Sequence, residues 1–190
     1  MVYLIRHAKV KNKWCDKYSL ADFINATNEY DFADIETISH QKLNQIKAII
    51  PKEFTLYTST LKRSIETARL IFPETSYTKI KQLSEIPIEP YTSKNKIHPL
   101  WIWFLFGRLQ WILNYKKQTR NRRIVNKEII EITQILEKNK NSIIIGHGFQ
   151  FSIMLNKFKK GYYISKTHKH IQNLDVIICE KKKGPTTAST

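Results

Sequence analysis

Two arginines and two histidines follow three apolar runs of this chain, and their types suit phosphoryl chemistry. Arg6 and His7 come directly after the first run, Arg63 lies in the first turn after the second, and His147 sits between two glycines after the third. A neutral imidazole is a nucleophile, and guanidinium groups neutralise the phosphoryl oxygens that would repel it. Each motif taken alone is also explained by a surface charge or a structural histidine.

The elements that must position these residues are predicted by apolar runs and capping signals. Strands are expected at 2–5, 54–58, 79–83, 142–145 and 175–179. Ser39 and Ser59 are expected N-caps of helices, and further helices are expected at 123–138 and 150–158. Residues 10–38 are expected to be a long loop with one short helix near 19–26. Ligands bind at the carboxyl ends of strands in open α/β sheets, so the basic residues should meet there.

The composition is that of one ordinary globular domain with an unusual charge. The chain has 190 residues, 42% of them apolar, and a formal net charge of +16. Such a charge suits anionic partners, although lysines filling solvated surfaces explain it equally. Cys15 and Cys179 have no metal-like spacing and no signal peptide opens the chain, so a reducing cytoplasm is expected. We expect a single domain at 1–180 and a disordered tail at 181–190.

Residues 100–113 form the most apolar run, flanked by basic residues on both sides. The run is short for a bilayer span and contains Arg108. We expect a helix in a hydrophobic insertion at about 90–120 that covers the site, with Trp101, Trp103, Phe104 and Phe106 mostly buried or held for a partner. A membrane-surface element with tryptophan anchors is the second interpretation, and a dimer contact is the third.

Short motifs that occur in order from about residue 2 to residue 158 resemble those of the histidine phosphatase superfamily, whose fold is called phosphoglycerate mutase-like. The matching residues are Arg6-His7-Ala8, Ile38-Ser39 with Gln45, Ser59 with Leu61, Arg63, Thr67 and Ala68, Leu83 with Glu85, and Gly146-His147-Gly148. The resemblance implies an α/β fold, a three-layer α/β/α sandwich with a mostly parallel central sheet.

The resemblance also implies a metal-independent phosphatase that needs no cofactor. His7 would attack phosphorus and become phosphohistidine, while Arg6, Arg63 and His147 would bind the phosphoryl oxygens. Glu85 would be the general acid, and Glu89 is the alternative. The implied substrate is a phosphorylated small molecule or a phosphoprotein, including phosphohistidine, and phosphate or sulfate should bind at the site.

Several positions depart from the family pattern, and other functions stay open. Ala8 replaces the usual glycine, and Lys9, Val10 and Lys13 stand where mutases hold substrate, which argues against mutase activity. One alternative is a non-catalytic relative that binds a phospho-ligand or a protein. Another is a basic binder of nucleic acid or a membrane surface, although no nucleic-acid motif is recognisable. The sequence does not indicate an oligomeric state.

Overall fold

The centre of the molecule is a six-stranded sheet with strand order β4-β3-β6-β1-β8-β7. The computed structural model describes residues 1–92, 94–115, 118–165 and 170–182. Neighbouring strands among β1, β3, β4 and β6 pair in parallel, and β8 is antiparallel to β1 and β7. The expected α/β fold with a mostly parallel sheet is confirmed. The strand bounds are β1 Val2–Arg6, β3 Thr55–Thr58, β4 Tyr77–Lys79, β6 Ser142–Gly146, β7 Tyr162–Ile164 and β8 Val176–Lys181.

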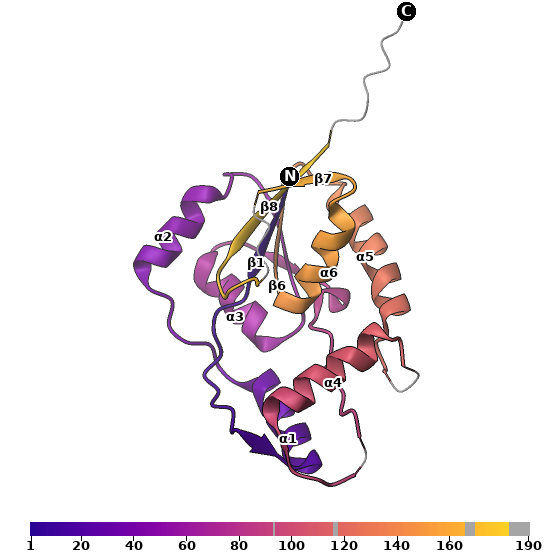
Figure 1. Cartoon of the computed structure of the whole chain (residues 1–190). Helices are drawn as coiled ribbons and strands as arrows, with labels where there is room; N and C mark the ends of the chain where they lie inside the picture. The colour runs from indigo at the N-terminus through magenta and orange to yellow at the C-terminus, as the bar shows by residue number, and fades with distance from the viewer. Residues whose placement is uncertain (93, 116–117, 166–169, 183–190) are drawn as a thin grey trace, which may run out of the picture.

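Helices cover both faces of the sheet because successive side chains of each strand point to opposite sides. Leu4 of β1 packs in one core cluster with α5 (Arg122–Leu136) and α6 (Gly148–Phe158). Ile5, the next residue, packs in a second cluster with α2 (His40–Ile49) and α3 (Lys62–Ile71). Figure 1 shows α2 and α3 on one side of the strands and α5 and α6 on the other.

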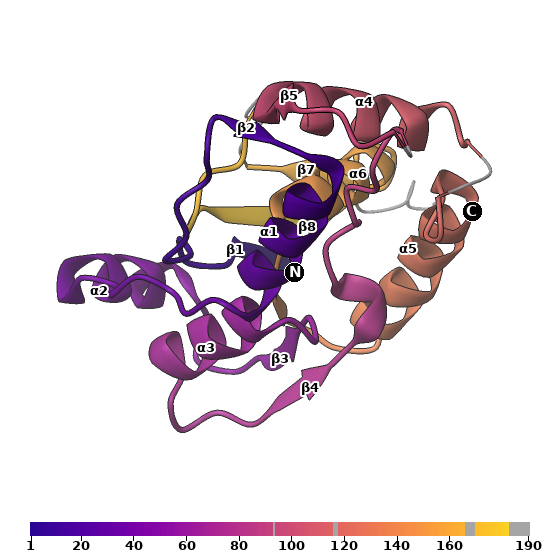
Figure 2. The same ribbon diagram turned by 90° about the horizontal axis from the view of Figure 1, so that it is seen from below.

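A further layer, here called the cap layer, lies beyond the carboxyl ends of the parallel strands (Figures 1 and 2). It consists of β2 (Lys17–Tyr18), α1 (Leu20–Phe32), β5 (His98–Pro99) and α4 (Leu100–Ile112). Its interior is a separate aromatic cluster in which the rings of Phe23 and Trp103 stack with centroids 4.9 Å apart. The cap layer therefore has its own apolar core.

Two local predictions need correction. The short helix expected near 19–26 is present as α1, but it extends to Phe32 and has 13 residues, and Ser19 caps it by accepting a hydrogen bond from the Asp22 N–H. Its periodicity was hard to see because Phe23 is its one buried residue. The strand expected at 79–83 ends at Lys79 and is followed by a 3₁₀ turn, Lys81–Leu83. The turn places Leu83 in the core, and this burial stabilises it.

The helix expected at 100–113 is present as α4, but the expected burial of its aromatic residues is only partly right. Trp103 is fully buried, whereas Trp101 is 62% exposed and Phe106 is 41% exposed. The prediction of a disordered tail falls almost entirely on residues 183–190, outside the described residues. No helix in the described part of the chain is long and apolar enough to cross a membrane.

Candidate active site

The parallel pairing of β1, β6 and β3 brings the predicted basic residues to one edge of the sheet. Arg6 is in register with Gly146, and the His7 N–H donates to the Gly146 carbonyl over 2.9 Å. His147 follows β6 directly, so the two imidazole rings lie with centroids 5.0 Å apart. Arg63, in the first turn of α3, donates from Nε to His147 Nδ1 over 3.3 Å. The structure therefore brings these four residues together.

His7 is held as a neutral imidazole with one defined tautomer. Its side chain is buried, and Nδ1 lies 2.6 Å from the Ala8 carbonyl oxygen. Because a carbonyl oxygen can only accept, Nδ1 carries the proton and Nε2 keeps its lone pair. Burial, and then the positive charge of Arg63, lowers the pKa of His7 to about 3. This is the protonation state that a nucleophilic histidine requires.

His147 is fully buried, and both of its ring nitrogens have protein partners. Since Nδ1 accepts from Arg63, Nε2 carries the proton and donates to Ser59 Oγ over 2.7 Å, with Ser64 Oγ as a second, longer acceptor at 3.3 Å. Burial is the main cause that keeps the pKa of His147 well below its ordinary value, and the positive charge of Arg63 acts in the same direction. The expectation that Ser59 is the N-cap of α3 was wrong: Leu61 is the N-cap residue, and the Ser59 hydroxyl accepts from the Leu61 N–H over 3.3 Å and bonds to His147.

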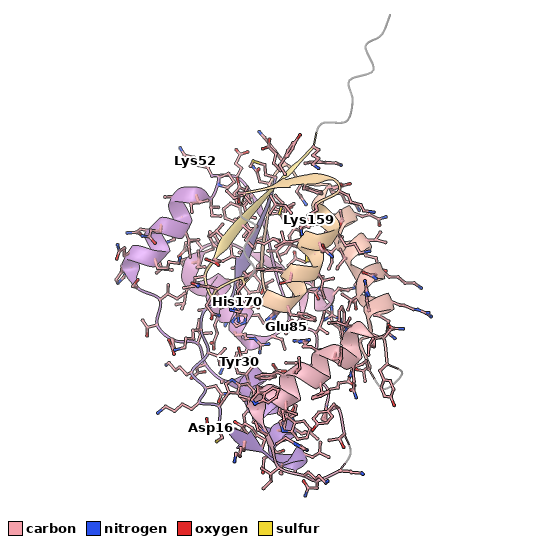
Figure 3. All side chains as sticks on the ribbon, in the orientation of Figure 1. Asp16, Tyr30, Lys52, Glu85, Lys159 and His170 are labelled. Atoms are coloured by element: carbon pink, nitrogen blue, oxygen red, sulfur yellow. The ribbon has the colours of Figure 1, made fainter. Side chains whose placement is uncertain are left out.

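Arg63 makes two contacts with α1 that no sequence motif indicated. Its Nη1 donates to Asp31 Oδ1 over 2.7 Å, and its guanidinium lies over the Tyr30 ring, 4.8 Å from the centroid. Arg63 is almost completely buried, whereas Asp31 is half-exposed. Helix α1 thus covers the second arginine, and Figure 3 shows Tyr30 in the region between the strands and the cap layer.

Arg6 is positioned by close packing against the first turn of α6. Its Nη1 donates to the Ile171 carbonyl, and its Nε is buried with no hydrogen-bond partner among the described residues. A Cβ atom at Gly148 would lie 3.2 Å from that Nε. Glycine at position 148 therefore lets the guanidinium approach the backbone, and the unsatisfied Nε is a donor that an anion could use.

Glu85 lies at the same site, whereas Glu89 does not. Glu85 Oε1 accepts from the backbone N–H groups of Ile86 (3.0 Å) and Gln150 (3.3 Å). Glu89 accepts from the Thr119 N–H over 2.8 Å. Among the described residues, Glu85 lines the central cavity and Glu89 does not. The geometry therefore favours Glu85 over Glu89 as an acid.

The cavity between the sheet edge and the cap layer has a volume of about 750 Å³. Its polar wall contains Arg6, His7, Arg63 and Glu85, and its apolar wall is formed by Trp14, Ile86, Pro87, Ile88 and Phe104. His147 is not part of the described cavity wall, since it lies behind His7 and Arg63. A pocket with one apolar side and a few convergent polar groups is the usual form of a small-molecule site.

Two more arginines reach the cavity and were not predicted. Arg108 donates to the Ile86 carbonyl over 2.9 Å and lies over the Phe149 ring, and burial lowers its pKa to about 10. Arg120 pairs with Glu128 over 2.8 Å and donates to the Ser84 carbonyl, which fixes the loop that carries Glu85. The signal for Arg108 was its position as a lone charge in an apolar run.

In the described part of the chain, no group of three or more histidine, cysteine, aspartate or glutamate side chains is placed to hold a metal ion. The arrangement instead offers a neutral nucleophile, several guanidinium groups and one carboxylate around a cavity. Such a set can bind a phosphoryl group and stabilise the negative charge that builds up during its transfer.

Comparison with solved structures identifies the fold. The alpha-ribazole phosphatase of Shigella flexneri superposes with a TM-score of 0.57 at 12% identity, over 92% of this chain and 87% of that one. The mycobacterial glucosyl-3-phosphoglycerate phosphatase gives 0.57 at 11% identity, over 92% and 87%. A phosphoserine phosphatase from Entamoeba histolytica gives 0.50 at 18%, over 84% and 79%. No family model and no curated protein sequence matches the chain.

These neighbours have the phosphoglycerate mutase-like fold, and the chain shares that fold. The fold expected from the sequence motifs is therefore confirmed along nearly the whole chain. At these identities the likeness establishes the architecture, and the chemistry has to be argued from the residues of this chain.

Proposed function

We propose that the protein is a metal-independent phosphatase that hydrolyses a phosphomonoester through a phosphohistidine on His7. One observation carries the proposal: a buried, neutral imidazole with its Nε2 lone pair free lies beside Arg63 and lines the same cavity as Arg6. A histidine that served only a structural purpose would not need a cavity with converging guanidinium groups in front of it.

In the first step, His7 Nε2 attacks phosphorus and the bond from phosphorus to the leaving oxygen breaks. Arg6 and Arg63 hold the non-bridging oxygens, and the Glu85 carboxyl gives its proton to the leaving oxygen. In the second step, Glu85 takes a proton from a water molecule that attacks phosphorus. The nitrogen–phosphorus bond then breaks, which releases phosphate and restores His7 and Glu85.

His147 acts mainly on Arg63 in this proposal. Its Nδ1 accepts from Arg63 Nε, and its Nε2 proton is held by Ser59. The imidazole therefore fixes the plane of the guanidinium that clamps the phosphoryl group. A direct contact of His147 with a phosphoryl oxygen, as the sequence motif implied, stays a prediction, because both ring nitrogens have protein partners.

The substrate class follows from the walls of the cavity. The cavity lining combines guanidinium groups, which suit a phosphoryl group, with apolar and aromatic side chains that include Trp14 and Phe104. The structural neighbours named above are phosphatases of phosphorylated small molecules, and a phosphorylated small molecule with an apolar or aromatic leaving group fits this cavity best. A phosphoprotein is the less favoured substrate.

The test is a screen of phosphomonoesters and phosphohistidine peptides with EDTA present throughout. We expect turnover that EDTA leaves unchanged and that Arg63→Ala lowers by at least ~10²-fold, since charge-assisted hydrogen bonds to the transferring group are lost. Arg69→Ala is the matched control, because Arg69 lies on the same helix but is exposed and bonds to Tyr77. Phosphate binding without turnover of any compound would contradict the proposal and indicate a non-catalytic binder.

A further inference from the structure

The outer face of α4 is apolar without interruption, which is unusual for a helix on a protein surface. Trp101, Leu105, Leu109 and Ile112 are spaced by four or three residues, so they share one side of the helix, and each is at least 42% exposed. Leu113, directly after the helix, is 70% exposed. Helices on soluble surfaces normally place polar residues on the solvent side.

The polar side chains of α4 stand at the borders of this face and turn inward. The helix contains two, and each is bonded to a carbonyl of the 86–91 segment: Arg108 to Ile86 over 2.9 Å and Gln110 to Tyr91 over 3.0 Å. Trp103 and Trp111 are buried on the inner side, and their indole N–H groups donate to the Tyr18 and Arg120 carbonyls. The inner contacts of α4 are therefore complete, and they leave the outer apolar face uncovered.

Cations stand at both ends of this face. At its start, Lys17 pairs across the small sheet with Pro99, which directly precedes α4, and Lys96 is exposed just before. At its end, Arg122 and Lys157 line a shallow surface pocket together with Ile112. Acidic residues also contact α4: the backbone carbonyl of the exposed Asp16 accepts from the Leu100 N–H, and the Glu89 carbonyl lies against Gly107 on the inner side.

We propose that α4 is an interfacial anchor that lies along an anionic lipid bilayer. The apolar face would enter the boundary between headgroups and acyl chains, and the cations at its two ends would meet anionic headgroups. The charge of the chain favours this occupant over a second copy, because two molecules of net charge +16 repel each other. In Figure 2, α4 forms an outer edge of the molecule, accessible to a flat surface.

This inference does not depend on the proposed phosphatase activity. The anchor would also place the cavity close to the membrane, because Phe104 and Arg108 of the same helix line the cavity. A bilayer that holds α4 would therefore lie beside the cavity wall, and an amphiphilic substrate could reach the site from the membrane.

The experiment measures partitioning of the full chain onto vesicles of phosphatidylglycerol and phosphatidylcholine, at low and at high sodium chloride. We expect binding that weakens with salt but persists, because only its electrostatic part is screened. The triple variant Leu105→Ser, Leu109→Ser, Ile112→Ser should bind at least ~10²-fold more weakly, since each buried aliphatic side chain is worth roughly tenfold or more. None of these three residues lines the cavity, so turnover of a soluble substrate should not change.

Two controls separate a lipid anchor from simpler explanations. A second triple variant, Ile49→Ser, Leu70→Ser, Ile130→Ser, removes exposed apolar side chains from α2, α3 and α5 and should bind as the wild type does. The tryptophan emission should shift to the blue on vesicles, and Trp101→Phe should remove most of that shift while binding remains.

Three results would overturn the proposal. Equal losses in both triple variants would mean that the position of the apolar residues is irrelevant. Complete release at high salt would mean that net charge alone drives binding. Absence of vesicle binding would assign the face to another occupant, a second copy if the α4 variant converts an oligomer to a monomer, or an acidic protein if the chain is monomeric.

Discussion

Replacing His7 by glutamine should change how the stability of the protein depends on pH. Burial and the nearby Arg63 lower the pKa of His7 from 6.5 to about 3. Between these two values the unfolded chain binds a proton at this histidine that the folded chain does not. The free energy of unfolding therefore falls as the pH falls through this window, by about 1.4 kcal/mol per pH unit for one such group.

The expected magnitude follows from the width of the window. Between pH 7 and pH 4 the free energy of unfolding of the wild type should fall by about 3 kcal/mol more than that of His7→Gln, because only the wild type has this histidine to protonate. Glutamine is a suitable replacement because its amide can donate to the Ala8 carbonyl, which His7 Nδ1 now does. Carboxylates titrate in both proteins, so the difference between the two curves isolates His7.

The assay is urea denaturation followed by circular dichroism at a series of pH values, in buffers without phosphate or sulfate. His40→Gln, an exposed histidine at the start of α2, corrects for the chemistry of the substitution. If the difference between wild type and His7→Gln stayed constant from pH 7 to pH 4, His7 would titrate alike in the folded and unfolded states. The argument for a buried neutral nucleophile would then be refuted.

Further predictions concern the acid, the buried network and the glycine contact. Glu85→Gln should lower turnover of an alkyl phosphate by ~10²–10⁴-fold and turnover of p-nitrophenyl phosphate much less, whereas Glu89→Gln should change neither rate. Steady-state kinetics checks this, and loss of activity in Glu89→Gln but not in Glu85→Gln would contradict the assignment. Ser59→Ala should cost about 1 kcal/mol in urea denaturation, because the buried imidazole N–H loses its nearer acceptor and keeps only Ser64 Oγ at 3.3 Å, and an unchanged midpoint would argue against the Ser59 hydrogen bond. Gly148→Ala should displace Arg6 and thereby weaken inhibition by inorganic phosphate roughly tenfold. Unchanged inhibition would mean that Arg6 does not bind the anion.

The sheet and the meeting point of the basic residues could be predicted because the signals are local. Val2–Arg6, Thr55–Thr58 and Ser142–Gly146 are short apolar runs, each followed by residues that carry chemistry. Parallel strands place their carboxyl ends at one edge, so the convergence of His7 and His147 follows from their sequence positions alone.

The cap layer was harder to predict because its contacts are made between distant parts of the chain. Helix α1 is recognisable as a site element only once Asp31 and Tyr30 are seen on Arg63, and nothing in its own sequence indicates that contact. Ser59 resembles an N-cap locally, and its hydroxyl is taken by an imidazole 88 residues away. Tertiary partners outweighed local propensity in both cases.

The exposed face of α4 shows the limit of reasoning from hydrophobicity. A run as apolar as residues 100–113 predicts burial, and Trp103 and Trp111 follow that rule. Trp101 does not, because one side of a helix is enough to close the small aromatic core beneath it. The basic flanks are the sequence signal for the anchor proposed here, and the direction of each side chain is the structural observation that favours it over a core helix.

The most direct test of the proposed chemistry is to trap the phosphorylated enzyme. The enzyme is mixed with a substrate that carries a labelled phosphoryl group, quenched in base, and digested for mass spectrometry. The account predicts a label that survives base, is lost in acid, and maps to His7, with none in His7→Gln. Continued turnover with no label on His7, or with the label on another residue, would contradict the proposed mechanism.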